Sequence, residues 1–342
     1  MTQTAEPITD PAASLFERRQ TTVGERIHHT LHRRPALSPL IVLVVAVVFF
    51  GLVNHNFVRP GTISLLLQQT SVVGSLAVGQ TLIILTAGID LSIGAVMVLS
   101  ALVMAKLTFD HGLPGIVALL LGLVVALAAQ AVNGLLVTRI HLPPFIVTLG
   151  TLSIFTAISL IYAHGQTIQL NGGLLIWTNN LHKLGQFNIN NGVILMVALY
   201  LAIGFALRFT AWGRHLYAVG DDAEGSRLAG VKVSRSLLGA YIVAGIAVMV
   251  AAWIFMGRVG GADPNGAINL NLNSITAVVI GGTSLFGGRG ALTGTLIGAL
   301  IVQVFQTGLN LSGVDPNYQV LAVGILVIVA VSVDQWIRKV KS

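Results

Sequence analysis

The sequence predicts an all-α polytopic membrane protein with about ten transmembrane helices, some of them broken or half-length. Of the 342 residues, 54% are hydrophobic and only 9% are charged, whereas an average soluble domain has about 25% charged residues. The apolar residues form runs of about 20, the length that a helix needs to cross a bilayer. Glycine is abundant, with 38 residues, and glycine lets helices approach closely in lipid.

The first 36 residues differ from the rest of the chain. They are polar and rich in arginine, and they lack the early apolar core of a cleavable signal peptide. We therefore expect residues 1–36 to form a cytoplasmic basic tail and residues 37–339 to form the transmembrane domain.

The apolar runs that follow the tail are separated by short polar segments or by glycine and proline. The predicted spans are 37–53, 62–85, 91–108, 115–137, 144–164, 193–209, 237–256, 274–286, 291–311 and 318–336. The eighth span is too short to cross a bilayer alone and runs into a glycine-rich segment, which predicts a half-helix followed by buried irregular backbone.

The distribution of basic residues gives the orientation. With the amino terminus in the cytoplasm, only Arg59, Lys106, Lys183 and Arg258 of the 19 lysines and arginines fall outside. Cytoplasmic loops carry the excess of basic residues in membrane proteins. Both termini are therefore predicted to be cytoplasmic, in a multi-pass protein of the bacterial inner membrane.

Several function classes are excluded by residues that the sequence lacks. There is no cysteine and no lysine that follows a glycine, which excludes thiolate metal sites and the phosphate-binding loop of ATPases. The histidines form no metal-binding pattern on a span, and no set of catalytic residues can be assembled without guessing the fold. The net charge of +7 reflects loop orientation, and we expect no nucleic-acid partner.

Two segments place glycines between apolar helices. These segments are 79–94, which contains Asp90, and 280–294. Asp90 is suited to cap the helix that begins at Leu91, because its carboxylate can accept the free N–H groups there; a role in the transport path is the second interpretation. Because both turns are predicted on the cytoplasmic side, they suggest a weak internal repeat of the first four spans in the last four.

Three spans each carry a stripe of amide side chains on one face, as helical periodicity requires. Amides in a span either form hydrogen bonds between helices or line a polar path, and for any single residue the sequence leaves both interpretations open. The candidate path residues are Gln69, Gln80, Asp90, Gln130, Asn133, Gln303, Gln306 and Asn310.

The longest cytoplasmic loop, 210–236, predicts a short capped helix over about 221–229, with an acidic start and a terminating glycine. Such a helix is either a solvated connector or a surface that a cytoplasmic partner grips. Its candidate contact residues are Arg214, Asp221, Asp222, Ala223, Glu224, Arg227, Leu228 and Gly230.

Four motifs in order resemble the ABC-type monosaccharide importer permeases of the ribose, xylose and fructose type. They are GQTLIILTAGIDLSIG, NGLLVTRIHLPPFIVTLGT, GRHLYAVGDDAEGSRLAGV and AVVIGGTSLFGGRGALTGTLIGAL. The resemblance covers about 37–339, and details near both ends look closest to the fructose branch.

This resemblance implies a permease subunit that forms the translocation path of a sugar importer and is not itself an enzyme. It implies as partners a cytoplasmic ABC ATPase, which binds the ATP and magnesium, an extracytoplasmic sugar-binding protein and a second permease copy, giving a homodimer. Loop 210–236 would then contact the ATPase, and the outer loops 165–191 and 263–273 would face the binding protein. The alternatives are a stand-alone secondary carrier or facilitator of small neutral solutes and, more weakly, an intramembrane enzyme.

Overall fold

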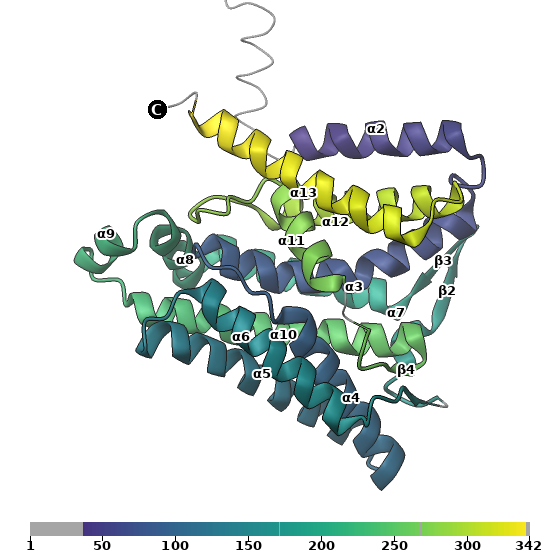
Figure 1. The fold of residues 1–342 in the computed structure, drawn as a ribbon, viewed down its shortest axis with the longest axis horizontal. Helices are drawn as coiled ribbons and strands as arrows, with labels where there is room; N and C mark the ends of the chain where they lie inside the picture. The colour runs from purple at the N-terminus through teal and green to yellow at the C-terminus, as the bar shows by residue number, and fades with distance from the viewer. Residues whose placement is uncertain (1–36, 171, 267–268, 340–342) are drawn as a thin grey trace, which may run out of the picture.

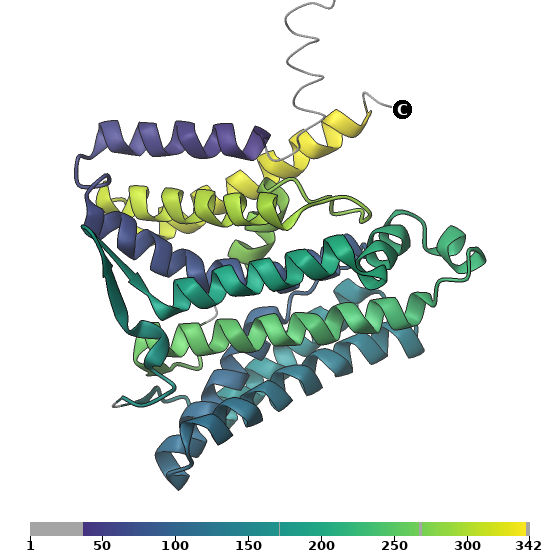
Figure 2. The same cartoon turned by 180° about the vertical axis from the view of Figure 1, so that it is seen from behind.

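The computed structural model describes residues 37–170, 172–266 and 269–339, so the predicted tail lies outside the described residues. The described chain is almost entirely helical (Figures 1 and 2). The helices are α2 (Leu37–Val53), α3 (Pro60–Leu85), α4 (Ile93–His111), α5 (Gly115–Arg139), α6 (Pro144–Tyr162), η2 (Trp177–Asn179), α7 (Asn191–Phe209), α8 (Ala211–Asp221), α9 (Ala223–Leu228), α10 (Val233–Val259), α11 (Leu270–Ile280), α12 (Leu292–Leu311) and α13 (Pro316–Lys339).

The predicted spans match these helices closely. Within the described residues, seven helices are long and apolar enough to cross a membrane, and α2 and α11 are shorter apolar helices. Together with α13 they account for the ten predicted spans, and the all-α prediction is confirmed. The largest error is at α11, which begins four residues before the predicted span and ends six residues earlier, although its half-length is as predicted.

Proline and glycine set several helix boundaries. Pro60 and Pro144 occupy the first turns of α3 and α6, where the missing N–H costs no hydrogen bond. Helix α4 ends at Gly112 and α10 at Gly260, both in the left-handed conformation that glycine adopts without steric strain. These local signals explain why the sequence placed most boundaries within a few residues.

The two ends of the bundle carry different small elements (Figure 1). At one end lie α8 and α9. At the other end β2 (Leu181–Leu184) and β3 (Phe187–Asn190) form an antiparallel hairpin in which Leu181 pairs with Asn190, and β1 (Ile168–Gln169) pairs with β4 (Gly261–Ala262). The predicted outer loop 165–191 is therefore partly ordered as a hairpin.

The helices are buried to different degrees. In the apolar segment of α4, 67% of the residues are buried inside the bundle, whereas in that of α6 only 28% are buried. The exposed side chains of α2, α5, α6 and α7 are mostly large and apolar, as expected of a surface that faces lipid. The helices α3, α4, α10 and α12 form the interior, and they position the polar groups described below.

Helices α11 and α12 pack with backbone touching backbone. A Cβ atom on Gly298 would overlap the carbonyl oxygen of Ala277, and one on Gly294 would overlap that of Gly281. In lipid the hydrophobic effect does not drive helices together, because the acyl chains are as apolar as the side chains. Helices associate there through close van der Waals packing of small residues such as these glycines.

We expect Gly298→Val to destabilise the protein by about 1–3 kcal/mol or more, because the carbonyl of Ala277 belongs to a helix backbone and cannot move aside. Thermal unfolding of the purified chain in detergent measures the effect. The control is Gly150→Val on α6, where a Cβ meets nothing within 4 Å. Equal unfolding temperatures of the two variants would contradict the close packing.

Candidate functional site

One cavity lies between α3, α11, α12 and α13, next to the end of α10. Its volume is about 360 Å³, within the range of small-molecule pockets. Its polar lining consists of Thr62, Gln69, Arg258, Asn273, Gln303, Gln306, Thr307, Asn310 and Gln319. We call it the amide cavity, because six of these residues carry side-chain amides and none carries a carboxylate.

Most of these amides are unpaired. Within the described part of the chain, the only amide of the cavity with a side-chain hydrogen bond is Gln319, which donates to the carbonyl of Val314. Gln303 is only 3% exposed and has no such bond. Buried amides usually find a partner, so the cavity offers donors and acceptors to a neutral, hydroxyl-rich ligand.

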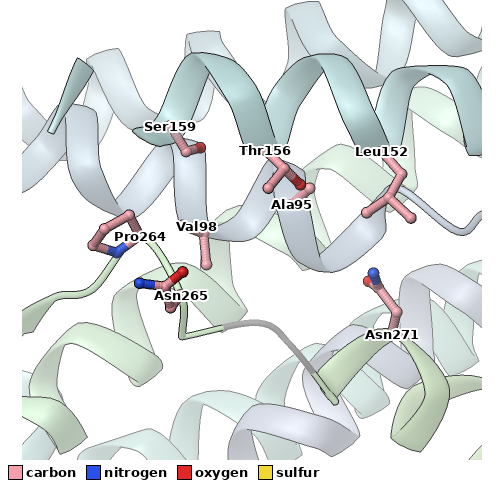
Figure 3. Close-up of a pocket in the computed structure, with 8 residues that line it drawn as sticks. All are labelled: Ala95, Val98, Leu152, Thr156, Ser159, Pro264, Asn265 and Asn271. Carbon is pink, nitrogen blue, oxygen red and sulfur yellow. The ribbon is translucent and has the colours of Figure 1, made fainter. Parts of the chain in front are cut away.

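A second, smaller pocket of about 160 Å³ opens between α4, α6 and the segment before α11 (Figure 3). The hydroxyls of Thr156 and Ser159 on α6 lie across from the amides of Asn265 and Asn271. Ser159 is fully buried, and its hydroxyl has no partner among the described residues. The polar groups that line this smaller pocket are therefore all uncharged.

The first turn of α11 joins these two pockets. Asn271 lines the smaller pocket and accepts a hydrogen bond from the N–H of Gly94 at the start of α4, while Asn273 lines the amide cavity. The sequence analysis placed residues 263–273 in an outer loop. The structure corrects this for 270–273, which belong to a helix, with Asn273 only 5% exposed.

Asp90 organises a separate, fully buried network. One carboxylate oxygen accepts from the N–H and the hydroxyl of Ser92, both at 2.7 Å, and the other accepts from the amide of Gln130 at 2.8 Å. Asn133 donates to the Ser92 hydroxyl at 2.8 Å. Asp90 is not the cap of α4 itself, because the helix begins at Ile93, two residues later than expected, with Ser92 as its N-cap. The Asp90 carboxylate instead accepts from the N–H of Ser92, just before the first turn.

The eight candidate path residues thus fall into different places. Gln69, Gln303, Gln306 and Asn310 meet in the amide cavity. Asp90, Gln130 and Asn133 instead form structural hydrogen bonds that join α5 to the turn between α3 and α4, the other interpretation that the sequence left open. Gln80 is fully buried and lines neither pocket, and its amide has no partner in the described chain.

The predicted cytoplasmic helix is present as α9. Asp222 is its N-cap and accepts from the N–H of Gly225 at 2.9 Å, and Gly230 follows the helix with φ +86°. Glu224 and Arg227 form an exposed ion pair at 2.6 Å, and the hydrogen bonds and charge of Arg227 hold the pKa of Glu224 below its ordinary value. Leu228 is 79% exposed, which leaves an apolar side chain free for a partner.

The helix α8, which precedes α9 and which the sequence analysis missed, ends in a junction of glycines. A Cβ on Gly220 would overlap the carbonyl of Leu85 at the end of α3, and one on Gly287 would lie 2.5 Å from the carbonyl of Gly220. The N–H of Gly288 donates to the same Leu85 carbonyl at 3.0 Å. Both glycine-rich turns therefore lie at one end of the bundle, as predicted, and α8 contacts both.

Sequence reasoning missed other residues of the site. Asn271, Asn273, Arg258 and Gln319 were not named as path residues, although amides that alternate with leucine before an apolar run were a signal for the first two. Nothing in the local pattern indicated that Gln319, early in the last span, faces the same cavity.

A bundle of membrane-crossing helices, with polar pockets whose linings contain no carboxylate and with an exposed helix at one end, fits a membrane permease. The model of the family described as "Branched-chain amino acid transport system / permease component" matches residues 62–331. The chain belongs to this family, and it is therefore a transport subunit and not an enzyme.

Named relatives support the same class. The chain is 45% identical to the fructose import permease protein FrcC of Rhizobium meliloti, over 98% of this chain and 94% of the relative. It is 36% identical to the ribose import permease protein RbsC of Bacillus subtilis, over 87% and 92%. With the D-allose transport system permease protein AlsC of Escherichia coli it shares 32%, over 87% and 91%. No solved structure matches the chain.

These relatives make the chain a membrane-spanning permease subunit of an ATP-driven importer in a bacterial inner membrane, and not a stand-alone carrier. Permeases of this class work with a separate ATPase, which binds the ATP, and with a substrate-binding protein.

We predict that Asp90→Ala lowers the thermal stability of the purified chain, because it leaves two donors of Ser92 and one of Gln130 without an acceptor. Each unpaired buried group costs about 1–3 kcal/mol. Asp90→Asn keeps an acceptor oxygen and should lose less. The control is Asp110→Ala at the exposed end of α4; an unfolding temperature of Asp90→Ala equal to this control would refute a structural role for the network.

Proposed function

We propose that this chain carries a neutral monosaccharide, with fructose as the first candidate, and that two copies form the permease dimer. The observation that carries the proposal is the amide cavity, with unpaired amides and no carboxylate. A sugar offers hydroxyls that both donate and accept, and amides match them without the cost of burying a charge. The likeness to permeases named for fructose, ribose and allose supports the same substrate class.

The path that we propose runs past the first turn of α11, where Asn271 and Asn273 face the two pockets. The other amides along this path are Gln69 on α3 and Gln303 and Gln306 on α12. Because specificity of such importers is expected to reside largely in the binding protein, these amides need only favour a polyol over an ion.

In this proposal the ATPase binds α9 from the cytoplasm, which is the side to which we assign both termini. Exposed Leu228 and the charged pair of Glu224 and Arg227 form the contact surface. Movement of α9 reaches α8, and the glycine junction passes it to the end of α3 and to the turn between α11 and α12. The hairpin β2–β3 at the opposite end is then the surface that faces the sugar-binding protein.

Replacement of Gln303 and Gln306 by leucine tests the path. We expect fructose uptake by the complete importer to fall about tenfold or more, because each lost hydrogen bond is worth about 0.5–1.5 kcal/mol. Membrane abundance and copurification of the ATPase should stay unchanged. The control replaces exposed Asn56 and Asn317 by leucine; uptake that falls equally in both variants, or in neither, would argue against the amide cavity as the path.

Reversal of charge at Asp222 and Glu224 to lysine tests the coupling. It removes the N-cap of α9 and its ion pair, and we expect the ATPase subunit to dissociate or its activity to become independent of transport. Copurification and substrate-stimulated ATP hydrolysis in liposomes measure this. The charge-matched control is Asp110→Lys with Asp315→Lys at the other end, and normal uptake by the α9 variant would exclude coupling at this helix.

A further inference from the structure

A groove of about 400 Å³ lies between the start of α8 and the start of α10, separate from the surface of α9 assigned to the ATPase. Its polar lining is formed by Trp212 and His215 of α8, and by Lys232, Arg235 and Ser236 around the first turn of α10. No path or coupling residue named above lines the groove except Gly230, which contributes no side chain. We call it the basic groove.

The basic groove contains hydrogen-bond donors without matching acceptors. Ser236 is 6% exposed, and its hydroxyl has no hydrogen-bond partner in the described part of the chain. Lys232 and Arg235 form no ion pair either, because the one salt bridge within the described residues joins Arg227 to Glu224. No carboxylate side chain lines the groove.

The backbone adds to the positive electrostatic potential of the groove. Helix α10 is 27 residues long and starts at Val233 without a side-chain cap, although the N–H groups of Val233 and Arg235 bond to nearby backbone carbonyls. The amino end of such a helix carries a partial positive charge and binds phosphate readily. The two cations and the unpaired hydroxyl, at the positive end of the α10 dipole, therefore point to a group with several negatively charged oxygens.

The depth of the groove favours one source of that group. Helix α7 ends at Phe209 and α10 begins at Val233, so the basic groove lies at the level where the spans leave the hydrocarbon. Phe205 and Phe209 are each 61% exposed on the lipid-facing side of α7, and Trp212 follows directly. Basic pockets at this level, next to an apolar surface, suit lipid headgroups.

We propose that the basic groove binds the phosphate of an anionic phospholipid. The phosphate oxygens accept hydrogen bonds from Arg235, Lys232 and the hydroxyl of Ser236. The bound lipid then occupies the groove between α8 and α10, beside the helix that we assign to the ATPase.

The test uses the full chain purified in detergent and titrated with phosphatidylglycerol or phosphatidylcholine, with bound lipid measured by native mass spectrometry. We expect at least tenfold tighter binding of phosphatidylglycerol, lost in a variant with Lys232→Gln and Arg235→Gln. The matched control, Arg139→Gln with Arg289→Gln, removes the same charge from exposed positions and should keep the preference. Ser236→Ala, which changes no charge, should weaken binding of phosphatidylglycerol a fewfold. This variant replaces the double variant as the test if the double variant does not fold.

The outcomes separate the sources. Equal binding of the two lipids, or equal loss in the groove and control variants, would overturn the proposal. A third arm adds inorganic phosphate: competition at millimolar concentration without any lipid preference would keep the phosphate chemistry but assign the groove to free phosphate. If the groove variant no longer copurifies with the ATPase but binds lipid as before, the lipid proposal is overturned and the groove is instead a contact surface for a protein.

Discussion

The contact on which the rest of the molecule depends is the glycine junction at one end of the bundle. There the carbonyl of Leu85 accepts a hydrogen bond from Gly288 and touches Gly220 directly. No side chain separates these backbones, so α8, the end of α3 and the turn before α12 cannot move independently without breaking the contact. A packed core is bistable and not continuously deformable, so a displacement of α8 at this junction would also displace the end of α3 and the turn before α12.

The polar residues of the spans fall into two groups, which differ in whether their side chains have hydrogen-bond partners within the protein. Gln130 and Asn133 use their amides to hold the break between α3 and α4 around Asp90. Gln303 and Gln306 leave theirs free in a cavity. Identical side-chain chemistry thus fixes one half of the bundle and leaves the other half receptive to a ligand.

Much of the fold could be predicted from the sequence, because the length of an apolar run and the proline or glycine at its end are local properties. Nearly every span boundary was correct within four residues. The exception was the end of α11, where the predicted span continued six residues into the glycine-rich turn after Ile280. The helix also starts four residues earlier than predicted, because its first turn is rich in asparagine and resembles a loop until the neighbouring helices bury it.

The site was predicted only in part for a physical reason. Helical periodicity shows that Gln303, Gln306 and Asn310 share a face, but what that face meets depends on α3, α11 and α13, which are remote in sequence. The pairing of Gln130 with Asp90 spans 40 residues, and no local pattern records it. The role of Asp90 depends on these remote partners, so the sequence alone could not decide whether Asp90 caps a helix or lines the transport path.

Helix α3 has one more consequence. Near its start, Ser64 accepts from the N–H of Asn188 in the hairpin and Gln68 donates to the carbonyl of the same residue, while its last residue is Leu85. Its 26 residues make an unbroken rod about 39 Å long. A tilt of this rod would displace the hairpin at one end of the bundle and the glycine junction at the other end at the same moment, so a single helix connects the two ends mechanically.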